Sequence, residues 1–387
     1  MLLHRLRLDF FRNYINQDIT FDSQINLIYG ENAQGKSNLL EAVSYLSAAS
    51  SFRGAKDWEL INFSKDYFYI EGEMTSKEEG RFTLSAAANT EGRHRWLLNR
   101  EPKTLLSDVV GLLHTVVFAP EDIYLIKSGP ASRRRWLNRQ MSQNSSEYFR
   151  LLMVYNQILK QRNACLKALQ KGGDEEELSA WDQQFLKCAI NIMALRFFNV
   201  RELDHWMQTI HARLSGGEEA RLVYESDLAG VMETNIQPPV TDNTADENLR
   251  LEEILLSRGQ QLLRKNRYRE ILAGHSLVGP HLDELRVVVD NKPARGFASQ
   301  GQQRTLALSL KLAELELAQQ KRGEYPLLLL DDVLSELDDK RRQHILAYVG
   351  DKTQTFITAV SDANPLGGKK IFISNGQAKP GDDARES

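Results

Sequence analysis

Residues 30–37 read Gly-Glu-Asn-Ala-Gln-Gly-Lys-Ser, and this octapeptide decides the fold class. It fits the P-loop pattern G-x-x-x-x-G-K-[ST], in which glycines let the backbone curl so that its N–H groups face phosphate oxygens. An apolar run at 25–29 precedes it, and apolar residues at helical spacing begin at Leu39. Because strand, loop and helix follow in the order that the motif requires, we predict an α/β fold with a nucleotide phosphate site. An ordinary glycine-containing turn is the alternative interpretation.

A second stretch supplies the acidic partner that a P-loop needs. Residues 326–332 read Pro-Leu-Leu-Leu-Leu-Asp-Asp, which indicates a buried strand that delivers two carboxylates to the edge of a sheet. We expect Lys36 to reach the β and γ phosphate oxygens, and Ser37 and Asp331 to bind Mg²⁺. Asp332 is then placed to polarise the attacking water, with slow turnover because Asp is one methylene shorter than Glu. A pair of helix-capping carboxylates is the alternative.

The composition is that of an ordinary globular protein. The 387 residues carry 49 Lys and Arg against 52 Asp and Glu, a formal net charge of −3. This composition argues against a wholly disordered chain, a collagen or a rod, and it leaves nucleic-acid binding open because a local basic face fits within a balanced total. Cys165 and Cys188 have no second pair for a metal site, so we expect reduced structural thiols. Charged residues near the N-terminus argue against a signal peptide, and no run reaches the ~18 apolar residues of a membrane helix, so we expect a cytoplasmic protein.

Patterning along the chain predicts an α/β head interrupted by a helical arm. We assign residues 1–112 and 275–375 to the head and residues 113–274 to an inserted, mainly helical arm. Alternating stretches at 68–99 indicate a small antiparallel sheet in the head. In the arm, Gly172 and Gly173 mark a break between long helices, a polar loop covers 238–246 and a further helix covers 248–272. Residues 376–387 have almost nothing to bury, so we expect a disordered tail.

Two further segments narrow the choice of superfamily. Residues 299–302, Ser-Gln-Gly-Gln, open a helix that leads toward the Asp331 strand, and they resemble the signature motif of ABC-type ATPases. In that motif a Ser hydroxyl, a Gly backbone and a helix N-terminus grip the γ-phosphate of a nucleotide held by another subunit. Residues 335–338, Ser-Glu-Leu-Asp, resemble the D-loop of the same superfamily. One P-loop and one signature per chain imply a head-to-tail homodimer that closes two ATP molecules in its interface.

A look-alike of the signature lies earlier in the chain. Residues 214–218 read Leu-Ser-Gly-Gly-Glu, close to the form L-S-G-G-Q, but no apolar strand ending in Asp-Asp lies nearby. We therefore expect a helix-terminating Gly-Gly turn at this place.

Together these motifs resemble the RecF family of bacterial recombination and gap-repair ATPases, relatives of the SMC-type ATPases. The resemblance covers residues 1–374, and its further hallmarks are Phe-Arg-Asn-Tyr at 11–14, Phe-Ala-Pro-Glu-Asp at 118–122, Gly-Pro at 129–130, three arginines at 133–135 and Val-Gly-Pro-His at 278–281. It implies an ATPase head with a short arm, ATP-driven dimerisation, slow DNA-stimulated hydrolysis with Mg²⁺, and binding of double-stranded and gapped DNA. It also implies cooperation with RecR and RecO in loading RecA onto SSB-coated single strands.

The motifs and the resemblance assign roles to individual residues. The catalytic residues are Lys36, Asp331, Asp332 and Ser299, and the metal ligands are Ser37 and Asp331. The nucleotide-binding residues are Arg12, Gly30, Glu31, Asn32, Ala33, Gln34, Gly35, Lys36, Ser37, Asn38, Gln300, Gly301 and Gln302. The candidate DNA-binding residues are Arg133, Arg134, Arg135, Arg139, Arg264, Lys265 and Arg267. Such side chains give salt-dependent, sequence-independent phosphate contacts, although each basic cluster is alternatively a solvated helix face.

Several residues depart from a family pattern or invite a second interpretation. Asn138 stands where the family commonly has Asp, which puts a salt bridge there in doubt, and residues 358–361 contain no histidine of the kind that switches ABC transporters. His281 and Asp283 lack further metal ligands, so we expect structural roles for them.

Three functions are compatible with the sequence. The first is a DNA-repair ATPase whose ATP-bound dimer clamps DNA. The second is a monomeric P-loop kinase-type phosphotransferase, which predicts an acceptor pocket and no use for Ser299. The third is an ABC-type subunit with a purely architectural role.

Overall fold

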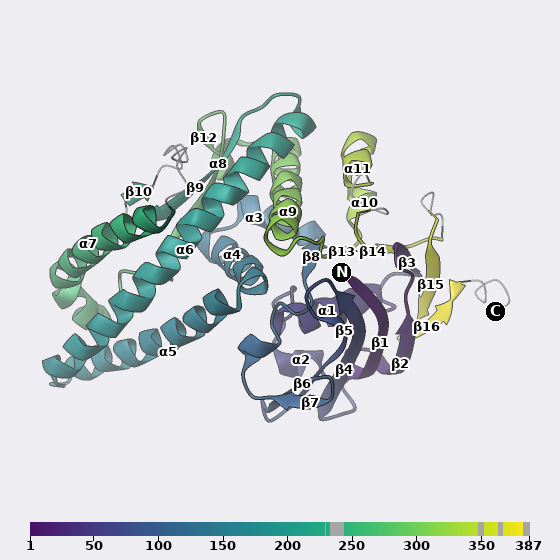
Figure 1. Cartoon of the computed structure of the whole chain (residues 1–387), viewed down its shortest axis with the longest axis horizontal. Helices are drawn as coiled ribbons and strands as arrows, with labels where there is room; N and C mark the ends of the chain where they lie inside the picture. The colour runs from purple at the N-terminus through teal and green to yellow at the C-terminus, as the bar shows by residue number, and fades with distance from the viewer. Residues whose placement is uncertain (229, 233–243, 347–351, 363–366, 382–387) are drawn as a thin grey trace. The chain divides into compact units, whose positions relative to one another are not determined.

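The computed structural model describes residues 1–228, 230–232, 244–346, 352–362 and 367–381 (Figure 1). The chain forms two compact units. The head unit comprises Met1–Asp122, Ser142–Ser146 and Glu314–Ser387, and the arm unit comprises Ile123–Met141 and Glu147–Ala313. Both units combine helices and strands, and the arm unit holds the longest helices. The predicted α/β class with an inserted, mainly helical arm is confirmed.

A six-stranded sheet in the head unit carries the P-loop. Its strand order is β16-β15-β3-β14-β13-β8, with β16 antiparallel to β15 and all other neighbours parallel. The strands are β3 (Ile25–Tyr29), β8 (Thr115–Phe118), β13 (Leu327–Leu330), β14 (Thr355–Ala359), β15 (Lys369–Ser374) and β16 (Gln377–Pro380). Every residue of β3, β8 and β13 is buried, as in parallel strands that are covered on both faces.

A second six-stranded sheet in the head unit is antiparallel throughout. Its order is β2-β1-β4-β5-β6-β7. The strands are β1 (Leu2–Phe11), β2 (Tyr14–Thr20), β4 (Tyr67–Ser76), β5 (Gly80–Asn89), β6 (His94–Leu98) and β7 (Glu101–Lys103). In β4 every second residue is buried, so one face of the sheet packs inward. The antiparallel sheet predicted at 68–99 is confirmed.

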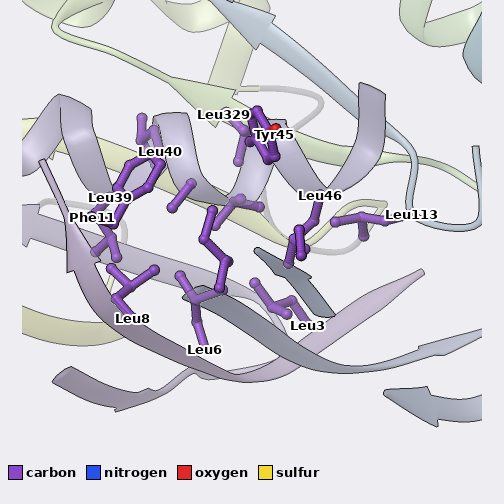
Figure 2. Packing of buried hydrophobic residues seen from close by; sticks show 14 of the residues in the cluster. Leu3, Leu6, Leu8, Phe11, Leu39, Leu40, Tyr45, Leu46, Leu113 and Leu329 are labelled. Carbon is purple, nitrogen blue, oxygen red and sulfur yellow. The ribbon is translucent and has the colours of Figure 1, made fainter. Parts of the chain in front are cut away.

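Helix α1 (Lys36–Ala48) packs in one hydrophobic core with residues of both sheets. Ten of its 13 residues are buried. Figure 2 shows Leu39 and Leu40 of this helix in the same cluster as Leu6 of β1 and Leu329 of β13. Burying one leucine side chain contributes about 1.5–3 kcal/mol. The helix that begins at the P-loop lysine is therefore anchored along most of its length.

Long helices dominate the arm unit. They are α4 (Pro130–Asn144), α5 (Ser146–Leu169), α6 (Glu175–Ser215), α7 (Thr244–Ala273) and α9 (Gln300–Arg322), of which α4 and α9 end in residues of the head unit. A four-stranded sheet, in the order β10-β9-β11-β12, consists of β9 (Ala220–Ser226), β10 (Gly230–Met232), β11 (Glu284–Val289) and β12 (Lys292–Pro293). The short helices of the chain are α2 (Asp57–Leu60), α3 (Tyr124–Lys127), α8 (Ala294–Phe297), α10 (Val333–Glu336) and α11 (Asp339–Leu346), with 3₁₀ turns at Leu106–Asp108 and Pro120–Ile123.

The predicted helix breaks agree with the structure in part. The chain leaves α5 at Leu169 and enters α6 at Glu175, where the Asp174 side chain caps the helix by accepting from the Glu176 backbone N–H. A second break, between α4 and α5 at Ser145, was not predicted. Residues 238–243 of the predicted loop lie outside the described residues. Residues 244–246, the rest of the predicted loop, belong to α7.

The compact units divide the chain at other residues than the sequence predicts. Residues 113–122 lie in the head unit because β8 pairs with β13. Residues 275–313 lie in the arm unit because β11 pairs with β9 in the arm sheet. Apolar patterning locates strands but does not reveal their pairing partners, so it could not place these two segments.

The prediction of a disordered tail at 376–387 is wrong for its first residues. Residues 377–380 form β16, which pairs with β15 over Ile371–Ser374. The Ala378 backbone N–H also donates to the Gln17 side-chain oxygen at 2.8 Å. Backbone hydrogen bonds, rather than apolar burial, order this strand, which explains why composition missed it. Residues 382–387 lie outside the described residues.

Candidate nucleotide site

The P-loop connects β3 to α1 through backbone conformations that favour glycine. Gly30 has a φ of +149° and Gly35 a φ of +118°. A Cβ on Gly30 would lie 2.2 Å from the carbonyl oxygen of Ile373, so only glycine fits there. Gly35 is the N-cap residue of α1 and has no side chain to compete for the N–H groups of the first turn. The loop therefore presents a helix N-terminus, a favourable place for an anion.

Lys36 lies inside the curve of the loop. Its ammonium group donates to the carbonyl oxygens of Gly30 and Glu31, both at 2.8 Å, and the residue is 4% exposed. A positive charge held by loop carbonyls beside a helix N-terminus suits a phosphate group.

Ser37 and Asp331 bring the loop and the acidic strand together. The Ser37 hydroxyl donates to Asp331 Oδ1 at 2.7 Å, across 294 residues of sequence. Burial raises the pKa of Asp331, although hydrogen bonds from Ser37 and Thr358 oppose that shift. A hydroxyl and a carboxylate are hard oxygen donors of the kind that Mg²⁺ prefers, so this pair fits the predicted metal role.

Asp332 follows directly, in a left-handed backbone conformation with a φ of +52°. It occupies the N-cap position of α10, but its side chain makes no capping hydrogen bond. The helix-capping alternative is therefore not realised by this carboxylate. Its backbone N–H donates to the Thr358 hydroxyl oxygen at 2.8 Å, which fixes the residue beside β14.

Thr358 is a site residue that the sequence analysis missed. Its hydroxyl lies 3.0 Å from Asp331 Oδ1 and 3.3 Å from Asp332 Oδ1. It comes from β14, which lies between β13 and β3 in the sheet. An apolar strand that ends in a hydroxyl residue was the available signal.

Asn13 is a second missed residue, and it organises the outer side of the loop. Its amide donates to the Gln34 carbonyl at 2.7 Å, and its side-chain oxygen accepts from Asn38 at 2.8 Å. The predicted residues Gln34 and Asn38 are thus tied to the turn between β1 and β2. Exposed positions of the loop are Glu31, Asn32 and Ala33.

Arg12 has a structural partner in this fold. Its guanidinium makes two hydrogen bonds of 2.9 Å to the carboxylate of Glu41, which is fully buried on α1, and one of 2.8 Å to the Glu59 carbonyl. The predicted contact with a nucleotide stays a prediction.

The signature segment belongs to the arm unit and begins helix α9. The Ser299 side-chain oxygen accepts from the Gln302 backbone N–H at 3.2 Å, and the Ser299 backbone N–H donates to the Gln302 side chain at 2.9 Å. This reciprocal cap leaves Ser299, Gln300 and Gly301 exposed. The look-alike at 214–218 ends α6, with Gly216 at a φ of +83°, so the predicted helix-terminating turn is confirmed.

The candidate DNA residues divide into buried and exposed groups. Arg133 is 4% exposed and makes a bidentate pair with Glu284 at 2.8 Å, so its predicted availability to DNA is wrong. Arg134 is half-buried and donates to the Asp283 carbonyl, and Arg267 pairs with Asp182 at 3.0 Å. Arg139 is also half-buried. The exposed residues are Arg135, Arg264 and Lys265.

The residues that invited a second interpretation have structural partners. Asn138 accepts from the Tyr148 hydroxyl at 2.7 Å and from Arg196 at 2.8 Å, so the position still binds a guanidinium, without a charge of its own. His281 lies 2.6 Å from the Tyr155 hydroxyl, and Asp283 pairs with Arg196. Among the described residues, no group of three or more His, Cys, Asp or Glu side chains is arranged to hold a metal ion.

Comparison with known proteins gives one consistent result. The RecF/RecN/SMC N terminal domain family matches residues 2–367. The DNA replication and repair protein RecF of Oenococcus oeni is 41% identical over 93% of both chains, and that of Bacillus subtilis is 39% identical over 93% of this chain and 94% of its own.

Solved structures agree with the sequence relatives. The recombination mediator protein RecF with ATP in the RecFOR pathway is 34% identical, with a TM-score of 0.87 over 98% of this chain and 97% of the other. The Smc head domain from Pyrococcus furiosus shares the fold at 18% identity and a TM-score of 0.53, over 98% of this chain and 95% of the other. Within the part of the chain that the structure describes, no helix combines the length and apolarity needed to cross a bilayer. The chain therefore belongs to the RecF family of the RecF/RecN/SMC superfamily of ATPases.

Proposed function

We propose that this protein is an ATP-dependent DNA-binding protein of replication and recombinational repair. The observation that carries the proposal is the 2.7 Å contact between Ser37 and Asp331, which joins a complete P-loop to a buried acidic strand. Support also comes from relatives described as DNA replication and repair proteins and from a relative whose structure includes ATP. A cytoplasmic location fits this role.

Different residues of the head unit have different roles in the proposed slow ATP hydrolysis. Lys36 and the first-turn N–H groups of α1 bind the phosphates, while Ser37 and Asp331 hold Mg²⁺. The metal ion, when bound, neutralises charge that develops between the β and γ phosphates. Asp332 accepts the proton of the attacking water. Thr358 holds Asp331 through its carboxylate and Asp332 through its backbone N–H.

The signature on α9 supports a dimeric active state. Ser299, Gln300 and Gly301 are exposed at a helix N-terminus, where an anion is favourable. In the proposed ATP-bound homodimer they close on the γ-phosphate held by the P-loop of the other subunit. Hydrolysis then opens the dimer.

The proposed DNA partner is double-stranded DNA, including the edges of gaps. Arg135 on α4, and Arg264 and Lys265 on α7, are the exposed cations of the candidate set. Phosphate contacts from such residues bind without sequence preference and weaken with salt. We further propose that the bound protein acts with RecR and RecO to load RecA onto SSB-coated single strands, since the solved relative belongs to the RecFOR pathway.

The test is the mass of the protein in solution. Light scattering should be performed at matched low salt with no nucleotide, with ADP and with ATP, and then with ATP and gapped duplex DNA. We expect a dimer only with ATP, and tighter DNA binding in that state. A monomer throughout that consumes ATP and ignores DNA would contradict the proposal and favour the phosphotransferase.

A further inference from the structure

A turn near the C-terminus lies against the outer side of the P-loop. The turn consists of Asn375 and Gly376, between β15 and β16. The Asn375 backbone N–H donates to the Gln34 side-chain oxygen at 2.6 Å. The Gly376 backbone N–H donates to the Gln34 carbonyl oxygen at 3.1 Å. One loop residue is therefore held by two successive N–H groups of a segment about 340 residues away in the chain.

The hairpin that carries this turn is fixed on both sides. β15 pairs in parallel with β3, the strand that leads into the P-loop. β16 is tied to β2 by the 2.8 Å hydrogen bond from Ala378 to Gln17. The Tyr29 hydroxyl, at the end of β3, donates to the Gly381 carbonyl at 3.0 Å. The turn is therefore held in a fixed position relative to β3, the strand that leads into the P-loop.

The turn and the loop fit closely enough that side chains would separate them. Gly376 has a φ of +69°, and a Cβ there would lie 2.2 Å from the backbone oxygen of Asn13. Asn13 is the residue whose amide also donates to the Gln34 carbonyl, at 2.7 Å. The Gln34 carbonyl therefore has two donors, the Gly376 backbone N–H and the Asn13 side-chain amide.

These contacts orient the N–H groups that a phosphate would meet. No described peptide bond is cis, and in a trans peptide the carbonyl oxygen and the next N–H point in opposite directions. Holding the Gln34 carbonyl outward therefore directs the Gly35 N–H inward. The Tyr14 hydroxyl donates to the Gly35 carbonyl at 2.9 Å and in the same way directs the Lys36 N–H. N–H groups set in advance bind a phosphate without a further cost of ordering.

We propose that the hairpin of β15 and β16 is a positioning element for the phosphate loop, and that the turn at Asn375 and Gly376 sets the affinity for ATP. The proposal rests on the ATP binding proposed above. Residues 375–381 lie in or beside the segment that composition marks as a disordered tail. The proposal predicts that they affect ATP binding.

The principal variant is Gly376→Ala, with Gly367→Ala as its matched control. Both glycines flank β15 and have nearly the same φ, +69° and +71°, so both substitutions introduce the same backbone strain. A Cβ on Gly376 meets Asn13, which also binds the Gln34 carbonyl, whereas a Cβ on Gly367 has no atom of the described residues within 4 Å. Loss of two hydrogen bonds predicts at least about tenfold weaker binding of a non-hydrolysable ATP analogue in Gly376→Ala. The control should bind as the wild type does.

A second readout needs no nucleotide. Amide hydrogen exchange of the nucleotide-free protein should be faster at residues 33–36 in Gly376→Ala than in Gly367→Ala, with the rest of the head unit unchanged. If the wild-type protein does not bind ATP, the proposed function fails. The difference in amide exchange still tests whether the hairpin of β15 and β16 positions the phosphate loop. Equal exchange and equal affinity in the two variants would overturn the proposal.

A third variant covers the case in which Gly376→Ala fails to fold. Gln17→Ala removes the acceptor of the Ala378 N–H on the far side of β16 and leaves the loop itself unaltered. We expect an affinity two- to threefold weaker and faster exchange at the same loop amides, since one hydrogen bond contributes less than two. Wild-type exchange and affinity in a Gln17→Ala protein of normal stability would count against the positioning role.

Discussion

The Thr358 hydroxyl contacts both carboxylates that the sequence assigns to hydrolysis. It carries one hydrogen, and Asp331 Oδ1 at 3.0 Å is its nearer carboxylate acceptor, while it accepts from the Asp332 N–H. Thr358→Val keeps the shape and removes these bonds. We expect kcat to fall by about 10- to 100-fold, because small errors in the position of a catalytic group are costly. Thr358→Ser should recover most of the rate. Phosphate release measures kcat and KM, and a valine variant with the wild-type kcat would contradict this role.

We expect His281 to make the folded protein less stable in mild acid. Burial lowers its pKa to about 4, and the positive charges of Arg134, Arg162 and Arg196 act in the same direction. The pKa of a histidine in the unfolded chain is ~6.5. Below that pH the unfolded state therefore binds a proton at this position, while the folded state does not. The stability contribution is therefore complete above about pH 6.5 and is lost as the pH falls toward 4, by up to about 1.4 kcal/mol per pH unit.

Urea unfolding between pH 7 and 4.5 measures this contribution. The His281→Gln variant should show a shallower decline than the wild type over that interval. Parallel curves for the two proteins would assign the acid sensitivity to other groups, such as His114, whose pKa burial lowers to about 3.

At the residue scale, the site residues that belong to short continuous motifs could be predicted from the sequence. The P-loop and the Asp331 strand each carry their geometry in a short run, and the structure places Ser37 and Asp331 in contact as expected. Thr358 was missed because its role depends on which strand lies beside β13, and strand order is not visible in a local pattern. Arg133 was misassigned because charge alone does not distinguish a DNA phosphate from Glu284.

At the element scale, helix α4 shows why three consecutive arginines do not form one surface. Successive residues of a helix are rotated by about 100°, so neighbouring side chains point in different directions. Arg133 faces inward and pairs with Glu284, whose side chain is 22% exposed, whereas Arg135 is exposed. The two residues should therefore have different effects when they are replaced.

We expect Arg133→Ala to destabilise the protein by about 2–3 kcal/mol, because it leaves a largely buried carboxylate without its partner. Arg135→Ala should change stability by less than about 0.5 kcal/mol. It should instead weaken DNA binding and reduce the dependence of that binding on salt. Denaturant unfolding and salt titration of DNA affinity measure the two effects. Equal loss of stability in both variants, or DNA binding insensitive to Arg135, would contradict this division.

Elements defined by apolar periodicity were predicted well, and those defined by backbone pairing were not. The run at 25–29 coincides with β3, and the leucine run at 326–330 contains β13. β16 has a polar sequence and owes its order to β15 and to Gln17, so composition indicated disorder. The arm sheet was not predicted, because its paired strands β9 and β11 lie about 60 residues apart in sequence.

At the scale of the whole molecule, the two half-sites lie in different compact units of one chain. The P-loop and Asp331 belong to the head unit, and Ser299 belongs to the arm unit. The proposed homodimer would pair the head site of one subunit with the signature of the other. Lys36→Ala damages only the first half-site, and Ser299→Arg damages only the second.

Mixing these two variants distinguishes a shared site from a site within one chain. Each variant alone should show almost no ATP turnover, because both composite sites of its homodimer carry a lesion. In a mixed dimer the intact P-loop of the Ser299→Arg chain meets the intact signature of the Lys36→Ala chain, so one of two sites is whole. An equimolar mixture should therefore regain ATP turnover that neither variant shows alone, with one working site in each mixed dimer. Ser299→Ala, which loses the cap of α9 without adding bulk, controls for the stability of the helix. A mixture as inactive as its components, although mixed dimers form, would show that the two half-sites act within one chain.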